Sequence, residues 1–202
     1  LIRKKDKNTL MEHVKIFTQS KLVKNLLIAL LGSILLAISS KIKIPFYPVP
    51  MTMQTLVVLS IGIVFGWKLG IATIALYLFE GIIGLPVFSG TPEKGVGLVY
   101  FTGPTMGYLI GFLFASFLTG VLKFENWSKK DHLAFKVFFI NFTKLLISVS
   151  LIYLLGIIWL SKFVGWEKVI VFGLKPFWLA ELFKIMLLSF LIPSVLKLKK
   201  II

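Results

Sequence analysis

The stretch of residues 77–112, YLFEGIIGLPVFSGTPEKGVGLVYFTGPTMGYLIGF, decides how the rest of the chain is organised. It leaves one apolar run at residues 84–86, crosses a connection rich in glycine and proline, and enters another apolar run at residues 103–105. The connection is itself apolar and aromatic, unlike an ordinary polar loop. We therefore expect it to fold back over the protein as a lid. A surface connector that touches no ligand is the alternative.

Composition places the chain in a membrane. Of its 202 residues 57% are hydrophobic, and the mean hydropathy is +0.94. In soluble domains only about half of the residues are apolar. Several uninterrupted apolar runs approach the length that spans a bilayer. Only helices or a closed barrel can satisfy their backbone there, and these runs do not alternate in polarity, so we expect an all-α integral membrane protein.

The net charge of +15 does not indicate nucleic acid. The charges lie between the apolar runs, where lysine usually flanks membrane helices. Arg3 is the single arginine of the chain, whereas bidentate phosphate recognition relies on arginine. The chain has no cysteine, which excludes thiolate metal sites and disulfides. We expect no metal, no cofactor and no removable signal peptide.

The apolar runs predict six membrane-spanning helices in one domain. Their approximate bounds are residues 22–40, 52–66, 69–84, 103–122, 133–160 and 177–196. Residues 1–21 form a basic segment that precedes them. If both termini are cytoplasmic, the inner segments hold most of the basic residues, as expected for a cytoplasmic membrane protein. Membrane lipid is then an expected partner.

The first span carries small residues at four-residue spacing, Ala29, Ser33 and Ala37. They share one helix face and let another helix approach closely. The neighbouring helix could belong to this chain or to another subunit.

Charged side chains within spans are functional candidates, because burying them in hydrocarbon is unfavourable. Glu181 and Lys184 are three residues apart on the last span and share a face. Asn141 and Lys144 lie on the fifth span, and Glu80 lies on the third. Together they could line an outward-opening pocket. The alternative is a self-satisfied Glu181–Lys184 pair and a Lys144 that extends to the interface.

Enzymatic chemistry fits the sequence poorly. The two histidines, His13 and His132, fall in expected cytoplasmic segments, and no HExxH motif is present. No GxxxxGK[ST] loop is present, so the chain cannot hydrolyse ATP by itself. An intramembrane hydrolase that uses Lys144 and a purely structural subunit are the alternatives.

Several motifs together resemble the BioY biotin transporters, the substrate-binding S components of energy-coupling-factor (ECF) transporters. They are PFYPVPMTMQT at 45–55, GWKLG at 66–70, GIIGLPVF at 81–88 and GPTMGYLIGF at 103–112, followed by PFWLAELFK at 176–184. The chain departs from that family at Ala180-Glu181, where Gly-Asp is usual, and at Met106, where Gly is usual. Glutamate keeps the acceptor but is one methylene longer.

The resemblance implies an S-component fold and biotin as the ligand. It implies that Glu181 accepts a hydrogen bond from a ureido N–H, while Lys184 donates to the ureido oxygen or to the carboxylate. It also implies a membrane coupling subunit and two ATPases as partners, with Ala29, Ser33 and Ala37 facing the coupling subunit. Another small vitamin-like acid is the alternative ligand, and a homo-oligomer is also open.

The substrate-binding residues that we expect combine charged, amide and aromatic groups. Aromatic walls with a few convergent polar groups are typical of small-molecule sites, although these aromatics could also anchor the chain at the membrane interface. The set is Glu181, Lys184, Tyr108, Gln54, Tyr47, Phe88, Lys144 and Asn141.

Overall fold

The fold is a bundle of helices with one short antiparallel ribbon. The computed structural model describes residues 21–45, 47–93, 95–127 and 133–201. The long helices are α2 (Lys21–Lys41), α3 (Gln54–Ile82), α5 (Met106–Val121), α6 (Ala134–Val164) and α8 (Trp178–Lys199). The short elements are α4 (Leu98–Phe101), α7 (Trp166–Gly173), β1 (Lys43–Ile44) and β2 (Met51–Thr52). The predicted helical class is confirmed, with the β1–β2 ribbon as an addition.

Four of the described helices are long and apolar enough to cross a membrane, namely α2, α3, α6 and α8. The apolar α5 is shorter, with 16 residues. Large apolar side chains are exposed along these helices; Leu31 of α2 is 62% exposed and Phe183 of α8 is 61% exposed. Such faces suit lipid and not water. The chain is therefore a membrane protein.

The helix α3 is a hairpin and not a straight rod. Gly66 lies inside it at φ 74° and ψ 173°, a backbone conformation that is almost restricted to glycine. A Cβ built on Gly70 would lie 3.4 Å from the Cα of Gly62. Gln54 Nε2 donates to Tyr77 OH at 2.7 Å, although 23 residues of straight helix would separate them by about 35 Å. The chain therefore reverses at the Gly66 turn that the sequence places between the runs 52–66 and 69–84.

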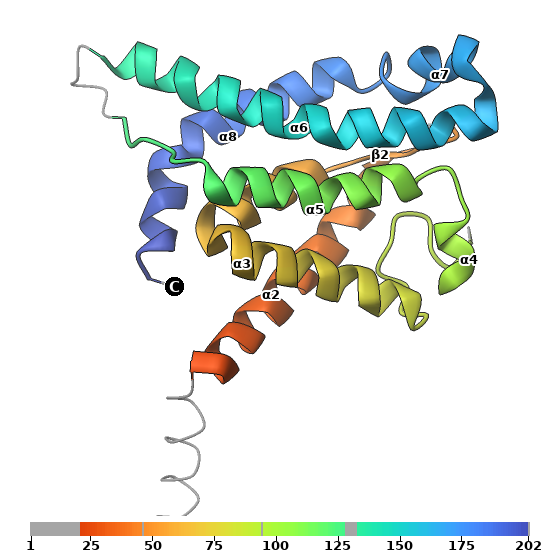
Figure 1. Ribbon diagram of the computed structural model, residues 1–202, viewed down its shortest axis with the longest axis horizontal. Coiled ribbons are helices and arrows are strands. Elements are labelled where there is room, and N and C mark those ends of the chain that lie inside the picture. Colours follow the sequence, from red (N-terminus) through yellow and green to blue (C-terminus); the bar gives the residue numbers. More distant parts are fainter. Residues whose placement is uncertain (1–20, 46, 94, 128–132, 202) are drawn as a thin grey trace, which may run out of the picture.

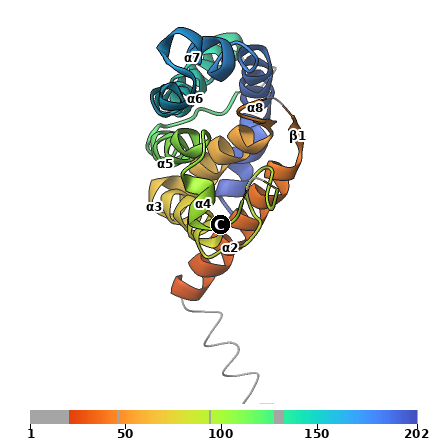
Figure 2. The ribbon, with the colours of Figure 1, turned by 90° about the vertical axis from the view of Figure 1, so that its right-hand side faces the viewer.

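The helices lie in layers (Figures 1 and 2). In both views α6 and α7 lie at one end, α5 and α3 follow, and α2 projects from the other end, while α8 begins beside α6 and ends at the level of α3. Gly111 lets α5 approach α6 closely, because a Cβ there would lie 2.6 Å from the Cα of Ile152. Fully buried side chains such as Tyr77, Ile152 and Leu188 form the core between the layers.

The small-residue face of α2 packs within the chain. Ser33 is fully buried, and its hydroxyl donates to Glu80 Oε1 of α3 at 2.8 Å. Ala29 is buried beside it, and Ala37 packs against the core. Of the two roles left open by the spacing, internal packing is the one seen here. The sequence predicts Glu80 near the pocket, but the structure places it in this contact between α2 and α3.

Candidate functional site

A small, partly open cavity lies where the start of α3, the segment after α3, α5, α6 and the start of α8 meet. Its volume is about 50 Å³. Its aromatic walls are Tyr100, Tyr108, Phe112, Tyr153 and Phe177. Its polar groups are Thr52, Gln54, Thr55, Ser89, Thr105 and Glu181. Aromatic walls with a few polar groups are typical of small-molecule sites, but such sites usually have volumes of roughly 300–1,000 Å³. A ligand of vitamin size therefore needs the walls to move outward.

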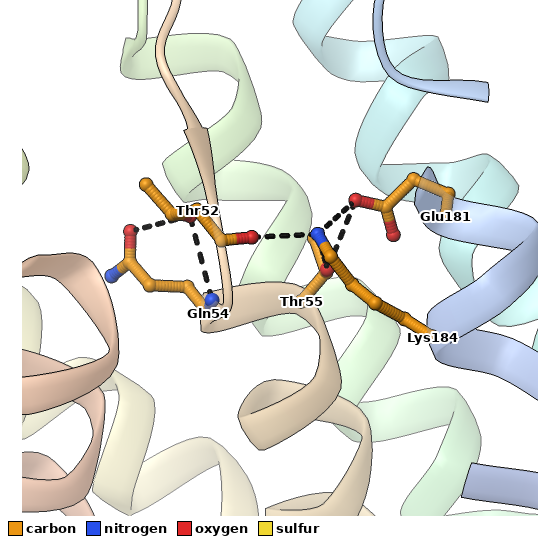
Figure 3. Close-up of polar contacts among 5 residues, drawn as sticks. All are labelled: Thr52, Gln54, Thr55, Glu181 and Lys184. Atoms are coloured by element: carbon orange, nitrogen blue, oxygen red, sulfur yellow. Dashed lines mark hydrogen bonds and ion pairs between the residues drawn. The ribbon is translucent and has the colours of Figure 1, made fainter. Parts of the chain in front are cut away.

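A buried ion pair joins Lys184 to Glu181, which lines this cavity. Lys184 Nζ lies 2.6 Å from Glu181 Oε1, with side chains that are 5% and 7% exposed. The same Nζ donates to Thr52 O at 2.6 Å and to Thr55 Oγ1 at 3.1 Å (Figure 3). Thr55 Oγ1 in turn donates to Glu181 Oε1 at 3.1 Å. The spacing predicts a shared face, and this pair is indeed formed. Its hydrogen bonds offset the unfavourable burial of two charges.

Two buried polar atoms at the cavity have no hydrogen-bond partner among the described residues. They are Ser89 Oγ and Glu181 Oε2, and both residues line the cavity. Buried polar atoms in native proteins nearly always have a partner. Both atoms are therefore available to a polar ligand. A third such atom, Ser116 Oγ, lies on α5 against Gly70 and not at the cavity.

Gln54 joins the cavity to the segment that follows α3. Its Nε2 donates to Tyr77 OH at 2.7 Å, and Tyr77 OH donates to Val87 O at 3.0 Å. At its other end, Gln54 Oε1 accepts a hydrogen bond of 3.3 Å from Thr52 Oγ1. Gln54 therefore lines the cavity and also orders its wall.

Residues 87–91, which we call the lid segment, are fastened over the helices. Val87 O accepts from Ser40 Oγ at 2.7 Å as well as from Tyr77. Phe88 O accepts from Lys41 Nζ at 2.9 Å, and Ser89 O accepts from Tyr100 OH at 2.8 Å. The segment therefore folds back over the protein, as its apolar composition indicates.

Tyr108 serves as a wall of the cavity. Its hydroxyl donates to Gly173 O of α7 at 2.9 Å, and its ring meets the ring of Tyr153 edge-on at 5.8 Å. The hydroxyl already has a partner, so the ring face is what Tyr108 offers to a ligand.

Asn141 and Lys144 lie away from the cavity. Lys144 Nζ donates to Lys123 O at 2.6 Å and lies 3.7 Å from Glu125 Oε1. Asn141 Nδ2 donates to Glu125 O at 2.8 Å, and its Oδ1 accepts from Glu125 N. Both side chains hold the segment that follows α5, and neither borders the cavity.

Two predicted aromatic residues also lie outside the cavity wall. Tyr47 is 87% exposed. Phe88 is fully buried and stacks on Tyr100, with ring centroids 4.7 Å apart, so it supports a wall residue from behind. The structure thus brings Glu181, Lys184, Gln54 and Tyr108 together.

Sequence reasoning missed several residues of the site, among them Thr55, Ser89 and Tyr153. Thr55 directly follows Gln54 in a matched motif, which is a usable signal. Ser89 and Tyr153 have no local signal, because only the tertiary fold brings them to Glu181. Glu181 and Tyr153 also border an apolar cavity of about 330 Å³ between α6 and α8. Among the described residues no cluster of three or more metal-ligating side chains occurs.

Comparisons with known proteins place the sequence among relatives of one family. A sequence profile of the BioY family matches residues 7–200. The probable biotin transporter BioY of Pyrococcus horikoshii is 32% identical over 150 residues, which are 74% of this chain and 82% of that protein. The biotin transporter BioY of Thermotoga maritima is 34% identical over 168 residues, which are 83% and 90% of the two chains.

One solved structure resembles the fold. It is the crystal structure of the S-component for biotin from an ECF-type ABC transporter, and it matches with a TM-score of 0.70 and 26% identity. The match covers 89% of this chain and 94% of that chain, so the likeness extends over almost the whole fold.

Proposed function

This chain belongs to the BioY family, and from that premise we propose that it takes up biotin across the cytoplasmic membrane as the substrate-binding subunit of an ECF-type transporter. The observation that carries the proposal is the unpartnered Glu181 Oε2 in an aromatic cavity. Biotin has a planar ureido group with two N–H donors on a partly apolar bicycle. A carboxylate that accepts from N–H, surrounded by aromatic rings, is complementary to that group.

The cavity is much smaller than biotin. Its volume of about 50 Å³ holds only a few water molecules. Entry of the ligand therefore requires the lid segment or the β1–β2 ribbon to move outward. Such motion gives a protein of this kind an open state that admits the ligand and a closed state that retains it.

Titration of biotin into the detergent-purified chain, with no partner present, tests the proposal directly. We expect tight binding at one site per chain. Alanine at Glu181 should weaken it strongly, whereas alanine at the distant Asn141 should not. Absence of binding in a sample shown to be folded would refute the assignment.

A second candidate ligand is another small vitamin-like carboxylic acid. It is favoured by one observation, the glutamate at position 181, which is one methylene longer than the usual aspartate and reduces the free volume. Competition of labelled biotin by such acids separates the two candidates. We assign the chain no enzymatic activity and no cofactor.

The membrane topology that we propose has six spans, with α3 contributing one from each arm of its hairpin. The approximate bounds are residues 22–40, 52–66, 69–84, 103–122, 133–160 and 177–196. Both termini are cytoplasmic in this topology, because the segments on the same side of the membrane as the termini hold most of the basic residues. The absence of cysteine makes a clean test available. A membrane-impermeant maleimide should label Lys43→Cys in intact cells and should leave Lys68→Cys unlabelled.

Transport against a gradient requires an energy source outside this chain. We propose a membrane coupling subunit and ATPase subunits as partners, because the sequence has no phosphate-binding loop. Co-purification of ATPases with the tagged chain, and loss of biotin uptake when they are deleted, would support this. Unchanged uptake without them would show that the chain transports alone.

A further inference from the structure

We propose that the first three turns of α6 bind an anionic phospholipid, with Lys136 and Lys144 at its phosphate and with Phe135 and Phe139 against its acyl chains. The site lies on a different part of the fold from the ligand cavity, so the proposal does not depend on which ligand that cavity takes. It gives a role to Lys144, which the sequence marks as a candidate for the cavity and the structure places elsewhere.

An open groove runs along one face of these turns, with a volume of about 520 Å³. Residues three or four positions apart on a helix share a face, and the lining residues follow that spacing. They are Phe135, Lys136, Phe139, Ile140, Thr143 and Lys144. Sites for small molecules usually have volumes of roughly 300–1,000 Å³, so the groove is large enough for a lipid headgroup. It therefore combines aromatic rings with two positive charges.

The apolar part of the groove points away from the protein core. Phe135 is 75% exposed and Phe139 is 48% exposed, and their ring centroids lie 4.6 Å apart. The helix that carries them is long and apolar enough to cross a membrane. Exposed rings on such a helix lie against hydrocarbon and not against water. The rings therefore offer a surface for the acyl chains of a lipid.

The charges beside the rings are mostly positive. Among the described residues from 122 to 144, Lys123, Lys136 and Lys144 are opposed by the single carboxylate of Glu125. Lys144 Nζ donates to Lys123 O at 2.6 Å and lies 3.7 Å from Glu125 Oε1. An ammonium group has three N–H donors, so the bond to Lys123 O does not exhaust it. A negative headgroup is complementary to this net positive charge, and lysine binds phosphate as a point charge.

The segment after α5 is fastened to both α6 and α8, which holds the lysine end of the groove in place. Asn141 is fully buried, and its side-chain amide accepts from Glu125 N at 3.2 Å and donates to Glu125 O at 2.8 Å. Trp127 Nε1 donates to Ser189 O of α8 at 3.1 Å. That carbonyl has no helical N–H opposite it, because Pro193 lies four residues further along. A site whose parts are ordered before binding loses less entropy when the ligand arrives.

The proposed topology places the start of α6 at the cytoplasmic leaflet, whose surface is negative because of its anionic lipids. Basic pockets beside membrane helices on that side suit anionic headgroups, and each lysine near the surface strengthens binding about fivefold. The lipid class is therefore a diacyl phospholipid with a net negative headgroup, for which phosphatidylglycerol is the probe. A zwitterionic headgroup lacks the net charge and should bind more weakly.

The test compares two lipids with identical acyl chains. Dioleoyl phosphatidylglycerol and dioleoyl phosphatidylcholine are added separately to the detergent-purified chain, and the bound lipid is counted by native mass spectrometry. We expect one phosphatidylglycerol per chain, bound roughly 25-fold more tightly than phosphatidylcholine, because two lysines contribute. Lys136→Gln should lower this preference about fivefold, and Lys136→Arg should retain it. Phe135→Ser should weaken both lipids by one common factor, because the ring contacts only the acyl chains.

Lys68→Gln is the matched control, since Lys68 is another exposed lysine on the same side of the proposed topology, 5.3 Å from the ring of Trp67. It should leave the preference for phosphatidylglycerol unchanged. Lys136 and Phe135 are exposed, so their variants should keep the melting temperature of the wild type. Equal binding of the two lipids by the wild type, or equal losses of preference in Lys68→Gln and Lys136→Gln, would overturn the proposal. Biotin does not enter these measurements, so their outcome is independent of the proposed function.

Discussion

Removal of the lysine from the buried pair should destabilise the protein strongly. In Lys184→Met a side chain of similar length keeps most of the packing, but the Glu181 carboxylate loses its charged partner. Both side chains are less than a tenth exposed, at 5% and 7%, so water does not replace the lost interaction. Breaking such a buried pair from one side usually destabilises by about 3–5 kcal/mol.

The expected decrease in melting temperature follows from the length of the chain. For soluble domains of about 150–250 residues, 1 kcal/mol corresponds to roughly 2–4 °C in melting temperature, so we expect a decrease on the order of 10 °C. Unfolding followed by tryptophan fluorescence in detergent measures it. The double variant Glu181→Gln with Lys184→Met removes both charges and should recover much of the loss, because replacing a whole buried pair is often nearly neutral.

Lys144→Met is the matched control for this experiment. Lys144 also lies on a long helix and faces a glutamate, but its side chain is 22% exposed and that of Glu125 is 55% exposed. Exposed pairs contribute about 0–1 kcal/mol. We expect a decrease of only a few degrees. Equal melting temperatures of Lys184→Met and the wild type would refute the view that this pair, through its bonds to Thr55, holds α8 against α3.

Three further predictions concern the backbone and the lid. Gly66→Ala meets no atom within 4 Å but imposes strain at φ 74°, so thermal unfolding should reveal about 1–3 kcal/mol of lost stability. Gly111→Leu pushes α5 from the backbone of Ile152 and should lower the yield of folded monomer in size-exclusion chromatography, whereas Leu at the exposed Phe114 should not. Lys41→Met removes the donor to Phe88 O and should speed biotin dissociation several-fold in stopped-flow displacement; an unchanged rate would show that the lid segment does not depend on it.

Features that depend on local pattern could be predicted from the sequence. The spacing of Glu181 and Lys184 places them on one helix face whatever surrounds them, and the structure joins them at 2.6 Å. The Gly66-Trp67-Lys68 turn predicts a break between two apolar runs, and Gly66 is where α3 reverses. The composition of the lid segment predicts that it folds back. These inferences need only the geometry of neighbouring residues.

Position along a long helix could not be predicted in the same way. The helix α6 has 31 residues, so a residue on the fifth apolar run can lie at either side of the membrane. Lys144 precedes the cavity residue Tyr153 by nine positions, or about 14 Å along the axis. Its charge marked it as a candidate, but its depth relative to Glu181 depends on how α6 packs against α8. The same uncertainty applies to Asn141.

The small-residue spacing of α2 shows a different limit. The spacing of Ala29, Ser33 and Ala37 indicates that another helix packs closely against this face. It does not indicate which helix that is. Here it is α3, through the bond from Ser33 to Glu80. A contact with a coupling subunit would need other faces of α2, where Leu31 and Ile38 are exposed.

The junction of β2 and α3, residues 52–55, explains why the pocket and the lid segment belong together. Thr52 and Thr55 bind Lys184 on α8, and Gln54 between them binds Tyr77, which binds the lid segment at Val87. Three residues within the stretch 52–55 thus contact both sides of the cavity. They can do so because the hairpin at Gly66 returns Tyr77 to the level of Gln54. A straight α3 would place Tyr77 about 35 Å away and would leave both the lid segment and the glutamine amide without their partner. The reversal at Gly66 is therefore a condition for the site as well as for the fold.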